Sequence, residues 1–236
     1  MKKILALVLV CALALSLAAC GGDKKEESKV DLGNLLATGM EKDSVILVQG
    51  NLDEIYLGKF NEDYMEMTET TPEECEANYL SGIEVEADFF IYYFEIEYPS
   101  DEFRNEVIEF YKEIYSHSNY TVGSASKLDD NTYAVKLNIQ PIDIIDQVMT
   151  DWDAGMAPFW DKYADADVSA MSEEEYKQFD ADWGRAILDL AKSKMSSIGY
   201  MEEQSLAVQV IRDEDGIWQI ADNDFSTIDN AIIYYP

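Results

Sequence analysis

The sequence predicts a helix-rich α+β domain in which an antiparallel sheet of two hairpins packs against several helices. Apolar residues recur at helical spacing over most of residues 44–115 and 141–198. They alternate with polar residues over 133–139, and again around an Asp215-Gly216 pair. Because an isolated hairpin buries too little surface to be stable, we expect both hairpins to join one sheet.

The first residues of the chain have the features of an export signal. Lys2 and Lys3 precede an apolar stretch, residues 4–19, which is shorter than the roughly 20 apolar residues that a membrane-spanning helix needs. The stretch leads into Leu17-Ala18-Ala19-Cys20, which resembles the lipobox of bacterial lipoproteins. The resemblance implies cleavage after residue 19 and a diacylglyceryl group on Cys20, which would hold the exported protein at the outer face of the cytoplasmic membrane. The alternative is an uncleaved hydrophobic anchor.

Residues 20–43 are polar and predict a flexible, charged tether, so we expect a single α+β domain over residues 44–236. Asp43 or Ser44 is placed to cap the first helix, which continues to about Phe60.

Capping signals locate the next two helices. Thr71, Pro72 and Glu74 have the residue types and spacing of a capping box with proline at the first helical position. Pro99 and Ser100 end this helix and begin the next one.

The strands are predicted by alternation of apolar and polar residues. One strand covers residues 132–140 and follows a turn at Asp129-Asp130-Asn131, and Pro141 closes it. Val208 and Val210 belong to the second hairpin, for which we expect a tight turn at Asp215-Gly216.

Two helices are expected between the hairpins. Pro158 is expected to break or kink the first, and Ser172 with Glu175 predicts a capping box at the start of the second.

A short helix at about 225–232 ends the chain, and helices followed by a hairpin occur twice, at residues 44–140 and 141–222. This order leaves two interpretations open: a weak duplication, or one sheet with a helical insertion.

The charge of the chain excludes some classes of partner. There are 48 acidic residues against 17 lysines and arginines, which gives a net charge of −31 at pH 7. A field of this sign repels nucleic acid and anionic lipid headgroups. It attracts cations, basic peptides and basic protein surfaces.

Few residues are available for nucleophilic or zinc chemistry. Beyond Cys20, only Cys75 lies in the predicted fold, so no internal disulfide can form, and its acidic neighbours would raise the thiol pKa. We expect Cys75 to be a core residue. His117 is the only histidine and is expected to be solvated at a helix end. The His and Cys count excludes zinc sites of the usual kind, and we expect no cofactor.

Two acidic groups are candidates for chemistry. Asp151 and Asp153 flank a tryptophan, where a raised carboxyl pKa could support acid–base catalysis. Asp161, Asp165 and Asp167 have the spacing of weak Ca²⁺ ligands, although the segment lacks the glycine and the glutamate that an EF-hand requires. An acidic, solvated loop is the alternative, and we predict no metal site.

The chain has 15 tyrosines, 9 phenylalanines and 4 tryptophans, which could form a platform for sugars or peptides. Most fall at positions expected in the core. The candidates for ligand binding are Tyr92, Tyr93, Phe159 and Tyr163.

The lipobox, the charged tether, the tyrosine-rich helices and the pattern Val208-x-Val210-x5-Gly216-x-Trp218-x-Ile220 together resemble uncharacterised lipoproteins of Gram-positive bacteria with an NTF2-like (cystatin-like α+β) domain. The resemblance implies helices that close the concave side of a curved sheet around a pocket. This chain departs from the pattern, since three helices are predicted before its first clear strand. No catalytic motif of the family matches, so no catalytic residue is assigned.

The function predicted is that of a lipid-anchored, extracytoplasmic domain that binds a small ligand, a peptide or an envelope protein and is not an enzyme. One alternative is a hydrolase that uses Asp151 or Asp153. Another is an acidic spacer or assembly factor for a basic partner.

Overall fold

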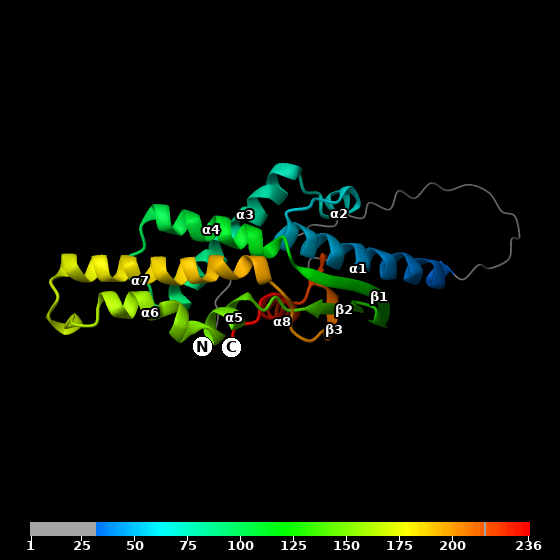
Figure 1. Ribbon diagram of the computed structural model, residues 1–236. Helices are drawn as coiled ribbons and strands as arrows, with labels where there is room; N and C mark the ends of the chain where they lie inside the picture. Colours follow the sequence, from blue (N-terminus) through cyan, green and yellow to red (C-terminus); the bar gives the residue numbers. More distant parts are fainter. Residues whose placement is uncertain (1–31, 215) are drawn as a thin grey trace, which may run out of the picture.

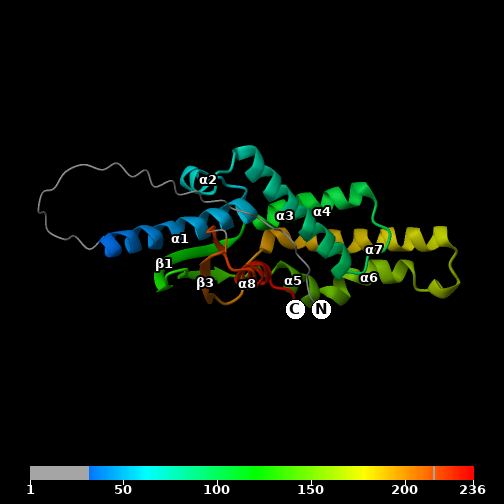
Figure 2. The ribbon, with the colours of Figure 1, turned by 180° about the vertical axis from the view of Figure 1, so that it is seen from behind.

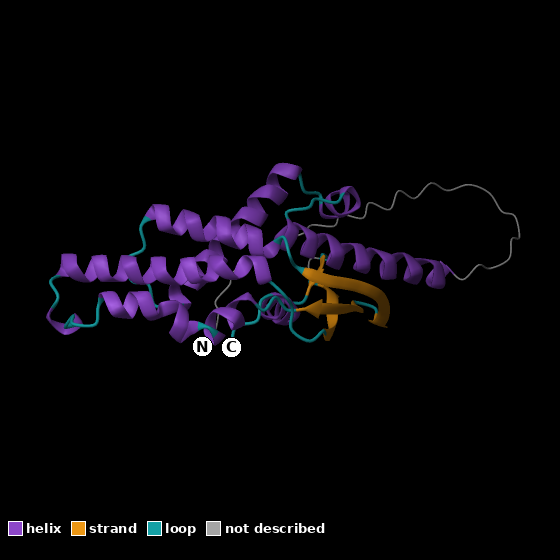
Figure 3. Ribbon diagram, in the orientation of Figure 1, coloured by secondary structure: helices purple, strands orange, loops and turns teal. Residues whose placement is uncertain are grey.

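The computed structural model describes residues 32–236 except residue 215, and it shows an α+β domain with one four-stranded antiparallel sheet (Figures 1 and 3). The helices among these residues are α1 (Leu32–Leu57), α2 (Glu62–Thr68), α3 (Pro72–Tyr93), α4 (Asp101–Tyr115), α5 (Ile144–Thr150), α6 (Trp152–Lys162), α7 (Glu173–Lys194) and α8 (Asp222–Ile232). The strands are β1 (Asn119–Asp129), β2 (Thr132–Gln140), β3 (Gln204–Arg212) and β4 (Trp218–Ile220). The predicted fold class is confirmed. The export signal, Cys20 and residues 20–31 of the expected tether lie outside the described residues.

Both hairpins belong to the same sheet, whose strand order is β1-β2-β3-β4. In the central pair, Val135 faces Val208 and Leu137 faces Leu206, so apolar side chains share one face. Helices α5, α6 and α7 lie in the chain between β2 and β3. This is the arrangement expected of a helical insertion between two hairpins of one sheet.

Three of the predicted caps are present. Thr71 Oγ1 accepts a hydrogen bond from the backbone N–H of Glu74 at 3.3 Å, while Glu74 Oε2 accepts one from the N–H of Thr71 at 2.8 Å. Ser172 and Glu175 form the same capping box at the start of α7. Ser100 caps α4. These local signals alone are sufficient to place three helix starts.

The expected start of the first helix is wrong. Helix α1 begins at Leu32, so residues 32–43 of the expected tether are helical, and the Ser44 hydroxyl donates to the carbonyl of Met40 at 2.7 Å inside the helix. The Ser44 hydroxyl is therefore hydrogen-bonded inside the helix and does not cap the start of the helix.

Pro158 does not break its helix either, since α6 continues to Lys162. Ala154 and Pro158 are both exposed, so the backbone carbonyl that proline leaves without a donor faces water. The helical path is interrupted earlier, at Asp151, between α5 and α6.

The turn of the last hairpin is longer than expected. The backbone N–H of Asp213 donates to the carbonyl of Ile217 at 2.9 Å, and the Asp213 carboxylate accepts from the N–H of Ile217 at 2.8 Å. The aspartate side chain thus closes a loop over 213–217 in place of a two-residue turn. Gly216 has a φ of 86°, a conformation that glycine adopts without strain.

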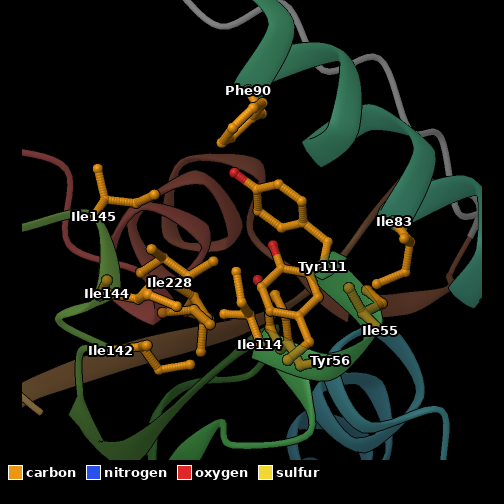
Figure 4. Close-up of a cluster of buried hydrophobic side chains, with 14 of the residues drawn as sticks. Ile55, Tyr56, Ile83, Phe90, Tyr111, Ile114, Ile142, Ile144, Ile145 and Ile228 are labelled. Carbon is orange, nitrogen blue, oxygen red and sulfur yellow. The ribbon is translucent and has the colours of Figure 1, made fainter. Parts of the chain in front are cut away.

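One core joins the helices to the sheet. Tyr56 of α1, Tyr111 of α4 and Ile228 of α8 are fully buried and lie together, with Phe90 of α3 above them (Figure 4). The Tyr111 ring packs edge-on against Phe90, with 6.1 Å between the ring centroids.

Two of the buried tyrosines, Tyr56 and Tyr111, have hydrogen-bonded hydroxyl groups. Tyr56 donates to Asp229 at 3.3 Å, and the hydroxyls of Tyr111 and Tyr235 lie 2.5 Å apart. These bonds attach α8 and the C-terminal segment to α1 and α4.

Helices α4, α6 and α7 form an arm beside the sheet. In both views α4, α6 and α7 run side by side away from the strands (Figures 1 and 2). A Cβ atom on Gly155 would lie 2.5 Å from the Leu190 side chain, so the small residue permits the close packing of α6 on α7.

Candidate functional site

A groove with a volume of about 380 Å³ lies between the first half of α1, helix α2 and the β3–β4 hairpin. We call it the α1–α2 groove. Its volume lies within the range of pockets that hold small ligands, about 300–1,000 Å³. Its lining contains an apolar set (Met40, Ile46, Leu47, Met67, Val210 and Trp218) and a polar set (Lys42, Asp43, Ser44, Asp63, Glu66 and Glu69).

The hairpin supplies part of the apolar lining. Val210 of β3 is fully buried, and Trp218 of β4 is 7% exposed. The Trp218 indole packs edge-on against the ring of Tyr133 on β2, with centroids 5.6 Å apart. This contact holds the indole in one position at the groove.

Helix α2 forms the opposite wall, and it lies very close to α1. A Cβ atom on Gly50 would lie 2.2 Å from Cγ of Tyr64, so only glycine allows the Tyr64 ring to rest on the α1 backbone. Asn61 caps the helix by accepting a hydrogen bond from the N–H of Tyr64 at 3.2 Å. Glu69 ends it with a φ of 53°.

A buried polar cluster lies where α1 meets α2 and α3. The Asn51 amide donates to the Tyr64 hydroxyl at 3.5 Å, and Asn78 of α3 donates to Glu54 Oε1 at 2.8 Å. Burial raises the pKa of the Glu54 carboxyl, and hydrogen bonds from Asn78 and Tyr64 partly oppose this shift.

Two acceptors of this cluster, Asn51 Oδ1 and Glu54 Oε2, have no hydrogen-bond partner in the described part of the chain. They are three residues apart and so lie on the same face of α1. A proton on Glu54 would supply a donor there, in keeping with the raised pKa.

The rim of the groove carries a high negative charge. Asp63, Glu66 and Glu69 are exposed, and no ion pair among the described residues includes them or Asp43. Burial raises the pKa of the Asp43 carboxyl, and the charge of Lys42 partly opposes the shift.

A second depression, of about 820 Å³, lies between α4 and α7, and two of the four glutamates in its lining form ion pairs. Glu106 accepts two hydrogen bonds of 2.7 Å from Arg185 and one of 3.0 Å from Lys192. These bonds lower the pKa of the Glu106 carboxyl to about 2. Glu109 pairs with Lys112.

Neither of the predicted catalytic carboxylates lines the α1–α2 groove or the depression between α4 and α7. Asp151 lies between α5 and α6, is mostly exposed and pairs with Lys194. Asp153 is exposed in the first turn of α6. The tryptophan between them instead stacks on Phe94, with centroids 5.9 Å apart and planes 6° from parallel.

The three candidate calcium ligands are also on the surface. Asp161, Asp165 and Asp167 are exposed, and the Asp167 carboxylate accepts from the N–H of Ser169 at 3.1 Å and from its hydroxyl at 2.6 Å. Asp167 thus caps a short 3₁₀ turn. Over residues 32–214 and 216–236, no group of three or more His, Cys, Asp or Glu residues is placed to hold a metal ion.

The aromatic candidates do not come together in one site. Tyr92 is 68% exposed, and the Tyr93 hydroxyl donates to the carbonyl of Pro236 at 3.3 Å. Phe159 is buried against the arm helices, and Tyr163 donates to Asp182 at 2.5 Å. None of the four lines the α1–α2 groove.

The surroundings of the last two candidates, Cys75 and His117, indicate structural roles. Cys75 is fully buried, as predicted, and burial raises the pKa of its thiol. His117 lies just after the end of α4, where its backbone carbonyl accepts a hydrogen bond from Tyr200 at 2.8 Å.

The residues of the groove were not selected from the sequence. Those on α1 before residue 44 fall in the segment predicted to be a tether, and α2 is too short to show a helical period. Asn61 followed by two acidic residues is a start signal that could have indicated α2.

A known structure has a similar fold. The crystal structure of a candidate lipoprotein (ycdA) from Bacillus subtilis matches this chain with a TM-score of 0.57 at 16% sequence identity. The match covers 87% of this chain and 60% of that protein, so this chain spans less than two thirds of its length. At this identity the similarity concerns the fold alone. Comparisons with protein families and with curated proteins gave no match.

The buried Glu54 carboxyl leads to a prediction about how the free energy of unfolding depends on pH. The pKa of Glu54 is higher in the folded chain than in the unfolded chain, so its contribution to stability falls as the pH rises through the unfolded value and then the folded value. Glu54→Gln has no such titration. The free energy of unfolding of this variant, minus that of the wild type, should therefore increase as the pH rises above about 4.3, the ordinary pKa of glutamate.

Urea unfolding at several pH values measures this difference, and Glu76→Gln on the exposed side of α3 is the control. A difference that is constant with pH, or that decreases, would contradict a buried Glu54 with a raised pKa.

Proposed function

We propose that this protein is a lipid-anchored domain at the outer face of the bacterial cytoplasmic membrane, and that it binds a ligand or an envelope protein in the α1–α2 groove without catalysing a reaction. The observation that carries the binding function is the groove itself. It combines an apolar lining with charged side chains from a second helix, which is the composition of a recognition site.

The anchoring part of the proposal rests on the sequence. The residues before Cys20 have the lipobox pattern, and the fold resembles that of a candidate lipoprotein from a Gram-positive bacterium. Two acyl chains of a diacylglyceryl group hold a protein stably on a membrane. An NTF2-like relationship stays part of the proposal, and α1, which lies against the sheet, would be the helix that closes its face.

No helix over the described residues is long and apolar enough to cross a membrane.

A hydrolase that uses Asp151 or Asp153 is less well supported. Both carboxylates are exposed, and neither lines the α1–α2 groove or the depression between α4 and α7. A general acid with a raised pKa would need an apolar, buried environment. The third candidate, an acidic spacer, would use the charge of the whole surface and would not need the groove.

Lipid attachment gives the first test. Cys20→Ala should abolish incorporation of radiolabelled palmitate in a Gram-positive host, because no other residue can receive the diacylglyceryl group in the lipobox reaction. Cys11→Ala, inside the apolar stretch, is the matched control and should leave labelling unchanged. Labelled Cys20→Ala protein would contradict the anchor.

The binding function is tested by occupancy of the groove. With methyl-labelled methionine, the signals of Met40 and Met67 should shift when a library of peptides, sugars and organic ions contains a ligand, whereas buried Met156 should not. If no compound shifts these two signals, or if ester, glycoside or peptide turnover is found and is lost in Asp151→Asn or Asp153→Asn, the proposal is wrong.

A further inference from the structure

We infer that the α1–α2 groove binds a basic peptide segment in which an apolar side chain lies between lysine or arginine residues. The inference rests on the proposed function, because it names the ligand of the same groove. Three features support it: the apolar lining, the spacing of the carboxylates, and the fact that these carboxylates form no ion pair among the described residues.

The lining favours an apolar group. Met40, Ile46 and Met67 are half-buried and present apolar surface to the groove, whereas Leu47, Val210 and Trp218 of the lining are almost or fully buried. A volume of about 380 Å³ is enough for side chains of a peptide but not for a folded surface.

The carboxylates are spaced for more than one cation. Asp63 and Glu66 are neighbours on one face of α2, and Glu69 follows at the C-cap of the helix. Asp43 stands on the other wall, on α1. A single ammonium group can contact only part of this row. An extended peptide places side chains of one face about 7 Å apart, so alternate lysines or arginines match it.

The negative charge of the groove is not neutralised by the protein. Its acidic residues form no ion pair with the described lysines and arginines, and Lys42 is the only basic residue of the lining. The wider depression between α4 and α7 differs, because Arg185 and Lys192 already bind Glu106 there. Charge complementarity therefore favours a cationic ligand in the α1–α2 groove.

Anionic ligands find few partners there. They need hydrogen-bond donors or cations, and the polar side chains of the lining supply only Lys42 and Ser44. The Ser44 hydroxyl already donates to the carbonyl of Met40.

The test measures binding of a fluorescein-labelled peptide, Lys-Leu-Lys-Leu-Lys with blocked ends, to the purified chain by fluorescence anisotropy. The double variant Asp63→Asn/Glu66→Gln should weaken binding by about five-fold or more. The matched control Glu202→Gln/Glu203→Gln removes the same charge from an exposed loop and should change affinity by less than about two-fold. A peptide with serine in place of leucine should bind about five-fold more weakly or worse.

Several results would overturn the inference. Equal losses in the two double variants, or equal binding of the serine peptide, would show attraction to the acidic surface as a whole. Displacement of the labelled peptide by spermidine at a matching concentration would show that cations alone are sufficient.

The failure of this inference can be distinguished from failure of the proposed function. If the peptide does not bind but another ligand shifts the methyl signals of Met40 and Met67, the inference is wrong and the binding function stands. If no probe shifts those signals, both are wrong.

Discussion

The structure depends on the packing of α1 between two layers. On one side the helix contacts β1, β2 and β4, and on the other it contacts α2 and α3. Such a helix must be buried nearly all round, and its buried residues between 44 and 56 include polar and small ones as well as apolar ones. The polar side chains of Asn51 and Glu54 are therefore enclosed with Tyr64 and Asn78 instead of facing water.

The candidate site is a consequence of this packing. Helix α2 is held against α1 at Gly50, so the acidic side chains of α2 stand beside Met40, Ile46 and Leu47 in the middle of α1. The β3–β4 hairpin closes the other end with Trp218, which Tyr133 holds in place. Negative charge beside an apolar lining gives the groove a preference for cationic, partly apolar ligands. The acidic composition of the chain alone does not show where on the surface this preference lies.

Sequence reasoning located the features that depend on neighbouring residues. The capping residues Thr71, Ser100 and Ser172 and the alternation in β2 and β3 were predicted because their hydrogen bonds and periods are local. The start of α1 was not predicted, because a serine such as Ser44 can either cap a helix or form a hydrogen bond inside one.

The candidate site was missed for a tertiary reason. Its walls come from segments far apart in the chain, and its apolar residues look like ordinary core positions in the sequence. Buried acids were also not predicted. Asp180, for example, is 2% exposed because its carboxylate accepts hydrogen bonds from the N–H groups of Glu97 and Tyr98 at 3.0 and 2.8 Å.

The contact between Gly50 and Tyr64 offers the most direct test of the central claim that α2 is held on α1 at one point of close approach. Gly50→Ala should lower the free energy of unfolding by about 1–3 kcal/mol, and hydrogen exchange should accelerate in α2 more than in β2. Gly82→Ala is the control: its Cβ would meet only Ile55 Cγ2, at 3.8 Å, so stability should be unchanged or should rise by up to about 1 kcal/mol. Equal stability of the two variants, with unchanged exchange in α2, would contradict the account.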